Sequence, residues 1–430
     1  MTSERFVVGL DIGTTKICAI VAQRTADRKL RILGMGHAES LGVQRGVIAN
    51  IDRTVESIQR AVSKASDSSK VHISEVFVGI AGQHIRSMQH RGVLIRKNGE
   101  TEISEEDIRQ LTDDMYKLVV NPGDRIIHVL PQEFFVDNEP DIRDPVGMCG
   151  TRLEANFHII TGQISAAQNI QRCINKCNLR MQELILEPLA SSAAVLHDDE
   201  KEAGVVLVDI GGGTTDIAIF HNNIIRHTCV IPFGGNVITE DIQEGCRVTR
   251  EQAEQLKRRF GSAIPSSNMD NQIISIPGIR GRPPKEISMR NLANIIHARM
   301  EEILELVDAE IEASGYKNKL VAGMVVTGGG AQLTNLVQLA EYVTGLDTRI
   351  GIPTEYLSPD QPAHLDELRH PMYATCVGLV LNGFRYYDEQ HKTATQVETQ
   401  HKDNRSFLQS LMDRFMLGVK SFLLEEIETK

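Results

Sequence analysis

Two segments of the chain share one pattern of apolar and polar positions. Residues 6–12 (FVVGLDI) and 205–210 (VVLVDI) are apolar runs that carry an aspartate near their end. Each is followed by a turn of glycine and threonine and then by a second apolar run. This pattern predicts two β-hairpins with the same turn chemistry. Because Asp11 and Asp209 occupy the same place in each hairpin, the pattern indicates that the chain contains a duplicated half.

The turns that follow the two aspartates have the composition of a phosphate-binding site. The glycines at 211–213 permit positive φ and expose successive backbone N–H groups. An aspartate that ends a buried strand is costly unless it meets a cation or hydrogen-bond donors. Two such turns facing each other would hold a polyphosphate, with Asp11 and Asp209 holding Mg²⁺, mainly through its water ligands. The alternative is that each aspartate only caps its own turn.

A third glycine cluster, Gly328–Gly329–Gly330, follows a short apolar run at 324–327. We expect a strand before it and a helix from about residue 333 to 343. At such a junction a base or ribose can approach bare backbone near a helix N-terminus that favours phosphate. The three clusters fit neither the P-loop nor the G-x-G-x-x-G fingerprint.

Taken together, these motifs resemble the phosphate-1, phosphate-2 and adenosine motifs of the superfamily of actin, Hsp70 and the sugar kinases. The segments 186–193 (LEPLASSA) and 373–380 (YATCVGLV) resemble its two connecting helices, in which small residues let the helices cross closely. The resemblance covers residues 5–385. It implies an α/β fold in which two duplicated actin-like, ribonuclease H-like domains flank a nucleotide cleft.

The resemblance implies ATP and Mg²⁺ as cofactors and assigns a role to each matching residue. Glu187 matches the acid that orients the attacking water; the alternative is a helix N-terminal acid that interacts with the macrodipole. Residues 248–257 are expected to include a helix capped by Thr249. Lys257 on that helix is a candidate contact to the base or ribose, or else a solvated charge. Lys16 adds positive charge at the phosphates, or else is a surface residue of its hairpin. The remaining assignments are Asp11 and Asp209 to the metal, Gly13, Thr14, Thr15, Gly211, Gly212, Gly213, Thr214 and Thr215 to the phosphates, and Gly328, Gly329 and Gly330 to adenosine. These assignments do not imply fast hydrolysis.

Between the first hairpin and the first connecting helix, the chain resembles the FtsA family of bacterial cell-division proteins. The matching segments are 76–85 (VFVGIAGQHI), 127–134 (IHVLPQEF) and 144–148 (DPVGM), which resemble the relocated 1C subdomain of that family. Between the first two segments, Ser104 predicts the capped start of a helix. The resemblance implies subdomain 1A at 1–83, 164–196 and 358–389, 1C at 84–163, 2A at 197–240 and 310–357, 2B at 241–309, a linker at 390–404 and a membrane-targeting amphipathic helix at 405–424.

Family resemblance also implies partners and location. A member of this family polymerises with itself on the cytoplasmic face of the cell membrane at the division septum. It anchors filaments of the tubulin-like protein FtsZ there by binding the FtsZ C-terminal tail through subdomain 2B, and it recruits later division proteins. Two other functions stay open at this stage: a sugar or acetate-type kinase of the same superfamily, and an adaptor resembling pilus-assembly ATPases.

The end of the chain supports a peripheral membrane role. Residues 390–404 are almost entirely polar, which is typical of a tether. The residues after them place large apolar side chains at helical spacing on one face, while Gln409, Asp413 and Lys420 fall outside it. The alternatives are a helix docked on the protein itself or a partner-binding helix. The expected membrane-facing residues are Phe407, Leu408, Leu411, Met412, Phe415, Val419, Phe422 and Leu423.

Charge and composition narrow the remaining possibilities. The net charge of −11 argues against a general nucleic-acid binder, which needs clustered Lys and Arg. We expect no signal peptide and no membrane-spanning helix, because no run approaches about 20 apolar residues. Cys173 and Cys177 are one helical turn apart but have no further ligands nearby, so we expect packed thiols. His128 and His158 lie among apolar neighbours and are expected to be structural.

Overall fold

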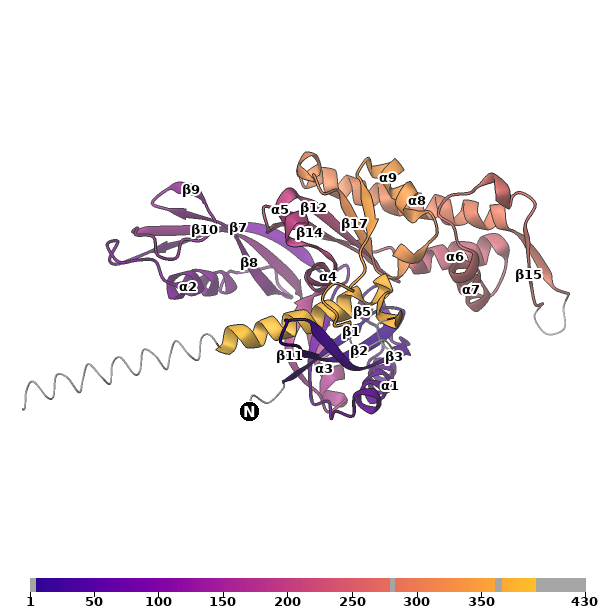
Figure 1. The fold of residues 1–430 in the computed structure, drawn as a ribbon, viewed down its shortest axis with the longest axis horizontal. Helices are drawn as coiled ribbons and strands as arrows, with labels where there is room; N and C mark the ends of the chain where they lie inside the picture. Colours follow the sequence, from indigo (N-terminus) through magenta and orange to yellow (C-terminus); the bar gives the residue numbers. More distant parts are fainter. Residues whose placement is uncertain (1–4, 279–282, 360–365, 392–430) are drawn as a thin grey trace, which may run out of the picture. The chain divides into compact units, whose positions relative to one another are not determined.

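The computed structural model describes residues 5–278, 283–359 and 366–391 of the chain. Residues up to Leu381 form one compact unit and a second unit begins at Asn382; the contacts below belong to the first. Its framework is two five-stranded sheets and one four-stranded sheet, with helices packed on them (Figure 1). The residues expected at the membrane, 407–423, and most of the expected linker and helix lie outside the described residues.

The first five-stranded sheet contains the first predicted hairpin. β1 pairs antiparallel with β2 and parallel with β6, so Asp11 lies near the carboxyl end of a central strand. Valines, isoleucines and alanines fill both faces of these strands, which explains the nearly unbroken apolar runs in the sequence. The order is β11 (Arg180–Leu186), β6 (Glu75–Ile80), β1 (Phe6–Ile12), β2 (Lys16–Arg24) and β3 (Leu30–Glu39).

The second five-stranded sheet repeats this arrangement. β12 pairs antiparallel with β13 and parallel with β17, and Asp209 lies where Asp11 lies in the first sheet. The prediction of a duplicated half is therefore confirmed at the level of strand order. The order is β14 (Ile224–Ile231), β13 (Thr215–His221), β12 (Val205–Ile210), β17 (Met324–Thr327) and β18 (Thr348–Ile350).

Helices cover the two sheets and form separate apolar cores with them. α1 begins after Asn50, whose side chain accepts a hydrogen bond of 3.0 Å from the backbone N–H of Arg53. The helix predicted near residue 250 begins after Thr249 with a capping box. The helices are α1 (Ile51–Ser69), α3 (Ile164–Lys176), α4 (Glu187–Val195), α5 (Asp198–Ala203), α6 (Gly235–Cys246), α7 (Arg250–Phe260), α8 (Met289–Ala313) and α9 (Leu336–Thr344), and residues 374–391 are also helical.

The four-stranded sheet is an insertion between β6 and α3 with its own apolar core. Its α2 (Glu105–Tyr116) starts at Ser104 with a capping box to Asp107, as the sequence predicts. The strand order is β7 (Arg86–Ile95), β10 (Arg152–Gln163), β8 (Asp124–Val136) and β9 (Glu139–Ile142). Short pairs complete the strands: β4 (Val43–Gln44) with β5 (Val47–Ile48), and β15 (Ile273–Ile276) with β16 (Lys285–Ser288).

Small residues permit the close crossing that was expected between the two connecting helices. A Cβ added to Gly378 would overlap the carbonyl oxygen of Ala190 in α4. A Cβ added to Gly9 in β1 would lie 2.7 Å from the carbonyl oxygen of Cys376. Larger side chains at either glycine would therefore separate α4, β1 and the helix that begins at residue 374.

Two further expectations concern single side chains. The Nε2 atom of His128 accepts a hydrogen bond of 3.0 Å from the backbone N–H of Leu186, and both ring nitrogens of His158 have partners, so both histidines are structural as expected. Cys173 and Cys177 pack their thiols near the carbonyl oxygens of Ile51 and Val55, also as expected.

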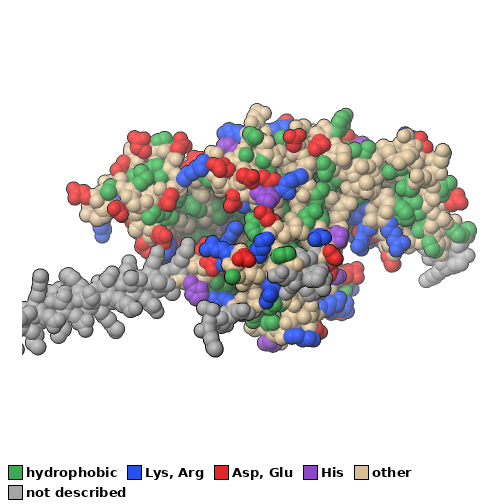
Figure 2. Space-filling view, in the orientation of Figure 1, with side chains coloured by type: hydrophobic (Ala, Val, Ile, Leu, Met, Phe, Trp, Pro, Cys, Tyr) green, Lys and Arg blue, Asp and Glu red, His purple; other side chains and the backbone are tan. Residues whose placement is uncertain are grey.

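The surface mixes acidic and basic side chains on the face shown in Figure 2. Among the described residues, no helix is both long enough and apolar enough to cross a bilayer.

Candidate functional site

The two predicted turns lie in direct contact. A Cβ added to Gly212 would lie 2.5 Å from the hydroxyl oxygen of Thr15, and one added to Gly213 would lie 2.6 Å from that of Thr14. The Thr14 hydroxyl also accepts a hydrogen bond of 3.0 Å from the backbone N–H of Gly46. Residues that are nearly two hundred positions apart in the sequence thus form one site, and glycine is required at 212 and 213 for the turns to approach this closely.

Four carboxylates gather beside these turns: Asp11, Glu187, Asp209 and Asp216. Asp209 and Asp216 are direct partners across β12 and β13. Burial raises the pKa of Asp11 to about 6 and that of Asp216 to about 8, and the neighbouring Asp209 adds to both increases. Burial, followed by repulsion from the three aspartates, raises the pKa of Glu187 well above its usual value. A buried group of acids with so little positive charge around it favours the binding of a cation.

Hydrogen bonds satisfy part of this cluster. Ser191 on α4 donates to Oδ2 of Asp209 at 2.6 Å, and Thr375 donates to the same atom at 3.2 Å. Thr214 donates to Oδ2 of Asp216 at 3.2 Å. The other oxygen of Asp216, Oδ1, is buried and has no hydrogen-bond partner. That unpaired oxygen fits a hydrated Mg²⁺ ion, which would supply the missing donors from its water ligands.

Sequence reasoning did not select Asp216, Ser191 and Thr375 as site residues. Asp216 is the second residue of β13, and its signal was a charged residue inside an otherwise apolar strand. Ser191 and Thr375 lie within the two connecting-helix segments, where close packing of the helices was enough to explain small residues. Their role depends on Asp209, which only the fold brings within reach.

Lys16 lies at the start of β2 and faces the acids. Its Nζ donates a hydrogen bond of 2.7 Å to the carbonyl oxygen of Met372 and lies 3.8 Å from the centre of the Tyr373 ring. Its charge lowers the pKa of Asp11 and Asp209, against the larger effect of burial. Lys16 is thus held in the site rather than on the outer surface of its hairpin.

Glu187 is the first residue of α4, and the side chain is directed toward β6. A Cβ added to Gly79 would lie 2.9 Å from Cγ of Glu187. The position at a helix N-terminus is the one expected from the sequence. However, Asp11, Asp209 and Asp216 are close enough to raise the pKa of Glu187, so Glu187 belongs to the acidic cluster. An interaction with the helix macrodipole alone would not require these neighbours.

The third glycine cluster adjoins the second turn. Gly328 has a φ of +85°, and a Cβ added to it would overlap Oδ1 of Asp209. Gly330 packs against Ile210 in the same way, whereas a Cβ on Gly329 would meet nothing within 4 Å. The expected helix start at 333 is wrong: residues Gly329–Gln332 form a 3₁₀ turn, and Asn335, with a φ of +61°, precedes α9, which begins at Leu336.

Lys257 on α7 is not a solvated charge. Its Nζ donates hydrogen bonds of 2.8 Å to the carbonyl oxygen of Gly235 and to the hydroxyl of Thr239, and forms an ion pair of 2.7 Å with Glu254. Burial lowers the pKa of Lys257. The backbone N–H of Gly235 in turn donates to the carbonyl oxygen of Gly211. Lys257 is therefore linked to the second turn through Gly235.

Several known proteins are similar to this chain along most of its length. The family model described as "Cell division protein FtsA" matches residues 206–378, and the one described as "SHS2 domain inserted in FTSA" matches residues 82–161. The chain is 41% identical over 383 residues to the cell division protein FtsA of Pseudomonas aeruginosa, covering 89% of this chain and 90% of that protein. Its identity to the Escherichia coli FtsA is 36%, over 89% of this chain and 91% of that one.

Solved structures share the fold at low sequence identity. The PilM–PilN type IV pilus biogenesis complex aligns with a TM-score of 0.63 and 14% identity, covering 88% of this chain and 98% of that chain. MreB5 of Spiroplasma citri bound to ADP aligns with a TM-score of 0.51 and 16% identity, covering 91% and 98%. The actin-like α/β fold expected from the motifs is therefore confirmed. The much higher identity to the division proteins favours them over the kinase and pilus-assembly alternatives. By its sequence identity along most of its length and by its inserted domain, the chain belongs to the FtsA family of cell-division proteins.

Proposed function

We propose that this chain binds ATP with Mg²⁺ where the two hairpin turns meet and uses the nucleotide to control assembly on the membrane. The observation that carries the proposal is the group of buried carboxylates beside two glycine–threonine turns, with Oδ1 of Asp216 left unpaired. A magnesium ion would neutralise the acids, and the turns' backbone N–H groups and threonine hydroxyls would bind phosphate oxygens.

Each residue's contribution follows from its place. Asp11, Asp209 and Asp216 would hold the metal through its water ligands, and Gly13, Thr14, Thr15, Gly211, Gly212, Gly213, Thr214 and Thr215 would contact the phosphates. Lys16 would offset their negative charge. Gly329, the one member of its cluster with open space beside it, would accept the adenosine, with Gly328 and Gly330 shaping that surface. Lys257 would contact the base or ribose only after exchanging one of its present partners.

Glu187 is the candidate acid for orienting the attacking water. Burial and the three neighbouring aspartates raise the pKa of Glu187 well above its usual value, which works against its use as a base without a metal. Bound Mg²⁺ would lower that pKa through its positive charge. Since activity depends on this shift, we propose that hydrolysis is slow and that nucleotide serves mainly to change the conformation of the two halves.

Nucleotide binding can be tested with the variant Gly329→Ala. The added methyl group meets no atom of the protein, so the fold should keep its stability, while the affinity for ATP should fall by about tenfold or more if adenosine packs there. A fluorescent ATP analogue titrated with and without Mg²⁺ measures both affinities. Gly123→Ala is unsuitable as a control because of its positive φ; Asp27→Asn, at an exposed turn, is the matched surface control. Equal affinity of Gly329→Ala and the parent would contradict the proposed adenosine contact.

We further propose that the protein polymerises on the cytoplasmic membrane surface, anchors FtsZ there through residues 241–309, and recruits later division proteins. Family membership supports this function, and the apolar spacing of residues 407–423 supports attachment by an amphipathic helix. Linked copies would bind the membrane with avidity although one helix binds weakly.

Truncation after Gln390 separates the two parts of the proposal. The shortened protein should no longer sediment with anionic liposomes, yet should bind Mg-ATP as the full chain does. The double variant Leu411→Asp, Phe415→Asp tests the apolar face without shortening the chain. Liposome binding by both variants would contradict membrane attachment through this segment. An FtsZ C-terminal peptide, titrated into the same proteins, should bind all of them equally.

A further inference from the structure

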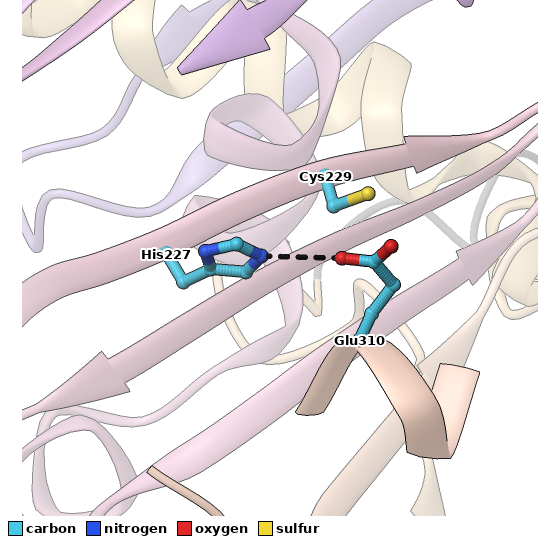
Figure 3. A group of neighbouring side chains, drawn as sticks. All are labelled: His227, Cys229 and Glu310. Carbon is cyan, nitrogen blue, oxygen red and sulfur yellow. Dashed lines mark ion pairs between the residues drawn. The ribbon is translucent and has the colours of Figure 1, made fainter. Parts of the chain in front are cut away.

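A second group of chemically reactive side chains lies between β14 and α8 (Figure 3). His227 and Cys229 are two residues apart on β14 and therefore lie on the same face of that strand. Glu310, near the end of α8, is directed toward both. The imidazole nitrogen, thiol sulfur and carboxylate oxygen of the three residues lie within 4.8 Å of one another. This group shares no residue with the nucleotide site.

We propose that His227, Cys229 and Glu310 form a binding site for a single Zn²⁺ ion. The donor set of one nitrogen, one sulfur and one oxygen suits zinc, whereas magnesium and calcium require oxygen ligands. One thiolate and one carboxylate would together balance the charge of a divalent ion. Zinc sites with three protein ligands keep a fourth position for water, which these three residues leave free.

The geometry needs little adjustment to hold the ion. Metal–ligand bonds of about 2.0–2.3 Å in a tetrahedron place ligand atoms roughly 3.4–3.6 Å apart. The separation of 3.6 Å between Nε2 of His227 and Oε2 of Glu310 already has this value. The remaining separations between ligand atoms are at most 4.8 Å, so side-chain movements of about 1 Å would bring all three atoms to bonding distance of one ion.

The polar atoms are also available. Nε2 of His227 is buried and has no hydrogen-bond partner, because its distance to Glu310 is longer than a hydrogen bond. A buried nitrogen without a hydrogen bond is costly unless something else binds it. The side chains of His227 and Glu310 remain 26% and 39% exposed, so an ion can enter from solvent. Burial raises the pKa of the Cys229 thiol to about 12, and a bound metal would displace that proton.

The position of the site suggests what zinc would do. β14 is the edge strand of its sheet. Other residues of β14 contact the inserted four-stranded sheet: the hydroxyl of Thr228 is hydrogen-bonded to His158 at 2.9 Å, and Arg226 forms an ion pair with Glu133 at 2.6 Å. A metal that joins β14 to α8 would hold this edge strand in place. Its effect would therefore be to stabilise the strand on which the inserted sheet docks.

Cobalt substitution tests the site directly. Full-length protein, reduced and freed of metal with a chelator, is titrated with Co²⁺ in excess Mg²⁺, which occupies oxygen-only sites. We expect one cobalt ion per chain, with the near-ultraviolet charge-transfer absorption of a cobalt–thiolate bond, and its displacement by Zn²⁺. Cys229→Ser should remove that absorption. Cys149→Ser, which removes an exposed thiol, should leave it unchanged.

A second variant and a second measurement distinguish the loss of zinc binding from misfolding of the protein. Glu310→Gln keeps the shape of the side chain and should weaken zinc binding by roughly 10- to 100-fold. Zinc should raise the thermal unfolding temperature of the parent and of Cys149→Ser, but not that of Glu310→Gln. Absorption that survives in Cys229→Ser, absorption that disappears only in Cys173→Ser, or no cobalt binding in the parent would each overturn the proposal.

Discussion

The hydroxyl of Ser191 donates a hydrogen bond of 2.6 Å to Oδ2 of Asp209, joining the first connecting helix to the acid of the second hairpin. The two residues are 18 positions apart, yet they belong to different elements, α4 and β12. Because α4 begins with Glu187, this bond also helps to hold Glu187 beside the aspartates. Ser191 is thus a positioning residue for Asp209.

Ser191→Ala should therefore destabilise the protein by about 1–3 kcal/mol, since a buried carboxylate loses a charge-assisted donor. Chemical denaturation measures the change. Ser192→Ala is the matched control, because the hydroxyl of Ser192 donates to the carbonyl oxygen of Leu189 in its own helix rather than to an acid. If both alanine variants lose the same stability, the bond to Asp209 has no special weight.

The acidic cluster predicts an unusual dependence of stability on pH. The pKa of Asp216 is raised from 3.8 to about 8 in the folded chain. Between those values the folded state binds more protons than the unfolded state, so this group's contribution to stability falls as pH rises. Asp216→Asn removes the buried charge and should gain stability over the parent as pH increases from 5 to 8. One pKa unit corresponds to about 1.4 kcal/mol, so the gain is a few kcal/mol at most.

Urea denaturation at several pH values, without divalent cations, measures the difference between Asp216→Asn and the parent. Asp27→Asn, at an exposed turn, should show no such trend. Saturating Mg-ATP should remove the variant's advantage, because the cation stabilises the ionised parent. A difference that stays constant from pH 5 to 8 would show that Asp216 is already ionised in the folded protein.

His128 predicts the opposite trend at acidic pH. Burial lowers the pKa of His128 from 6.5 to about 4, and its neutral ring accepts the hydrogen bond from Leu186. The unfolded state binds more protons between those values, so stability from this group is complete above pH 6.5 and is lost as pH falls toward 4. His128→Gln should reduce the loss across that window, by on the order of 1–3 kcal/mol. His72→Gln, at an exposed position, should leave the loss as it is in the parent.

Gly378→Ala should disrupt the crossing of the connecting helices. The methyl group would overlap the carbonyl oxygen of Ala190, and overpacking of this kind costs about 1–3 kcal/mol or more. Thermal unfolding of Gly378→Ala measures the loss. Gly329→Ala, whose methyl group meets no atom within 4 Å, is the control that should unfold as the parent does. Equal stability of the two variants would mean that the helices can separate at little cost.

The local features of this protein were predictable from the sequence because they depend on neighbouring residues. Apolar runs ending in aspartate and glycine-rich turns predicted both hairpins, and Ser104 and Thr249 predicted where two helices begin. The helix after Gly330 was placed too early, since Asn335 adopts a left-handed conformation that the pattern of apolar residues does not reveal.

The tertiary structure alone decided which distant groups meet. Sequence patterns showed that Asp11 and Asp209 are equivalent, but not that Asp216 lies opposite Asp209 with one oxygen unpaired. Lys16 reaches a carbonyl oxygen 356 positions away, and Glu310 on α8 completes a cluster begun by two residues of β14. These contacts depend on strand order and helix packing. Burial and charge act through space, and the separation of two residues along the chain does not tell how close they lie in the fold.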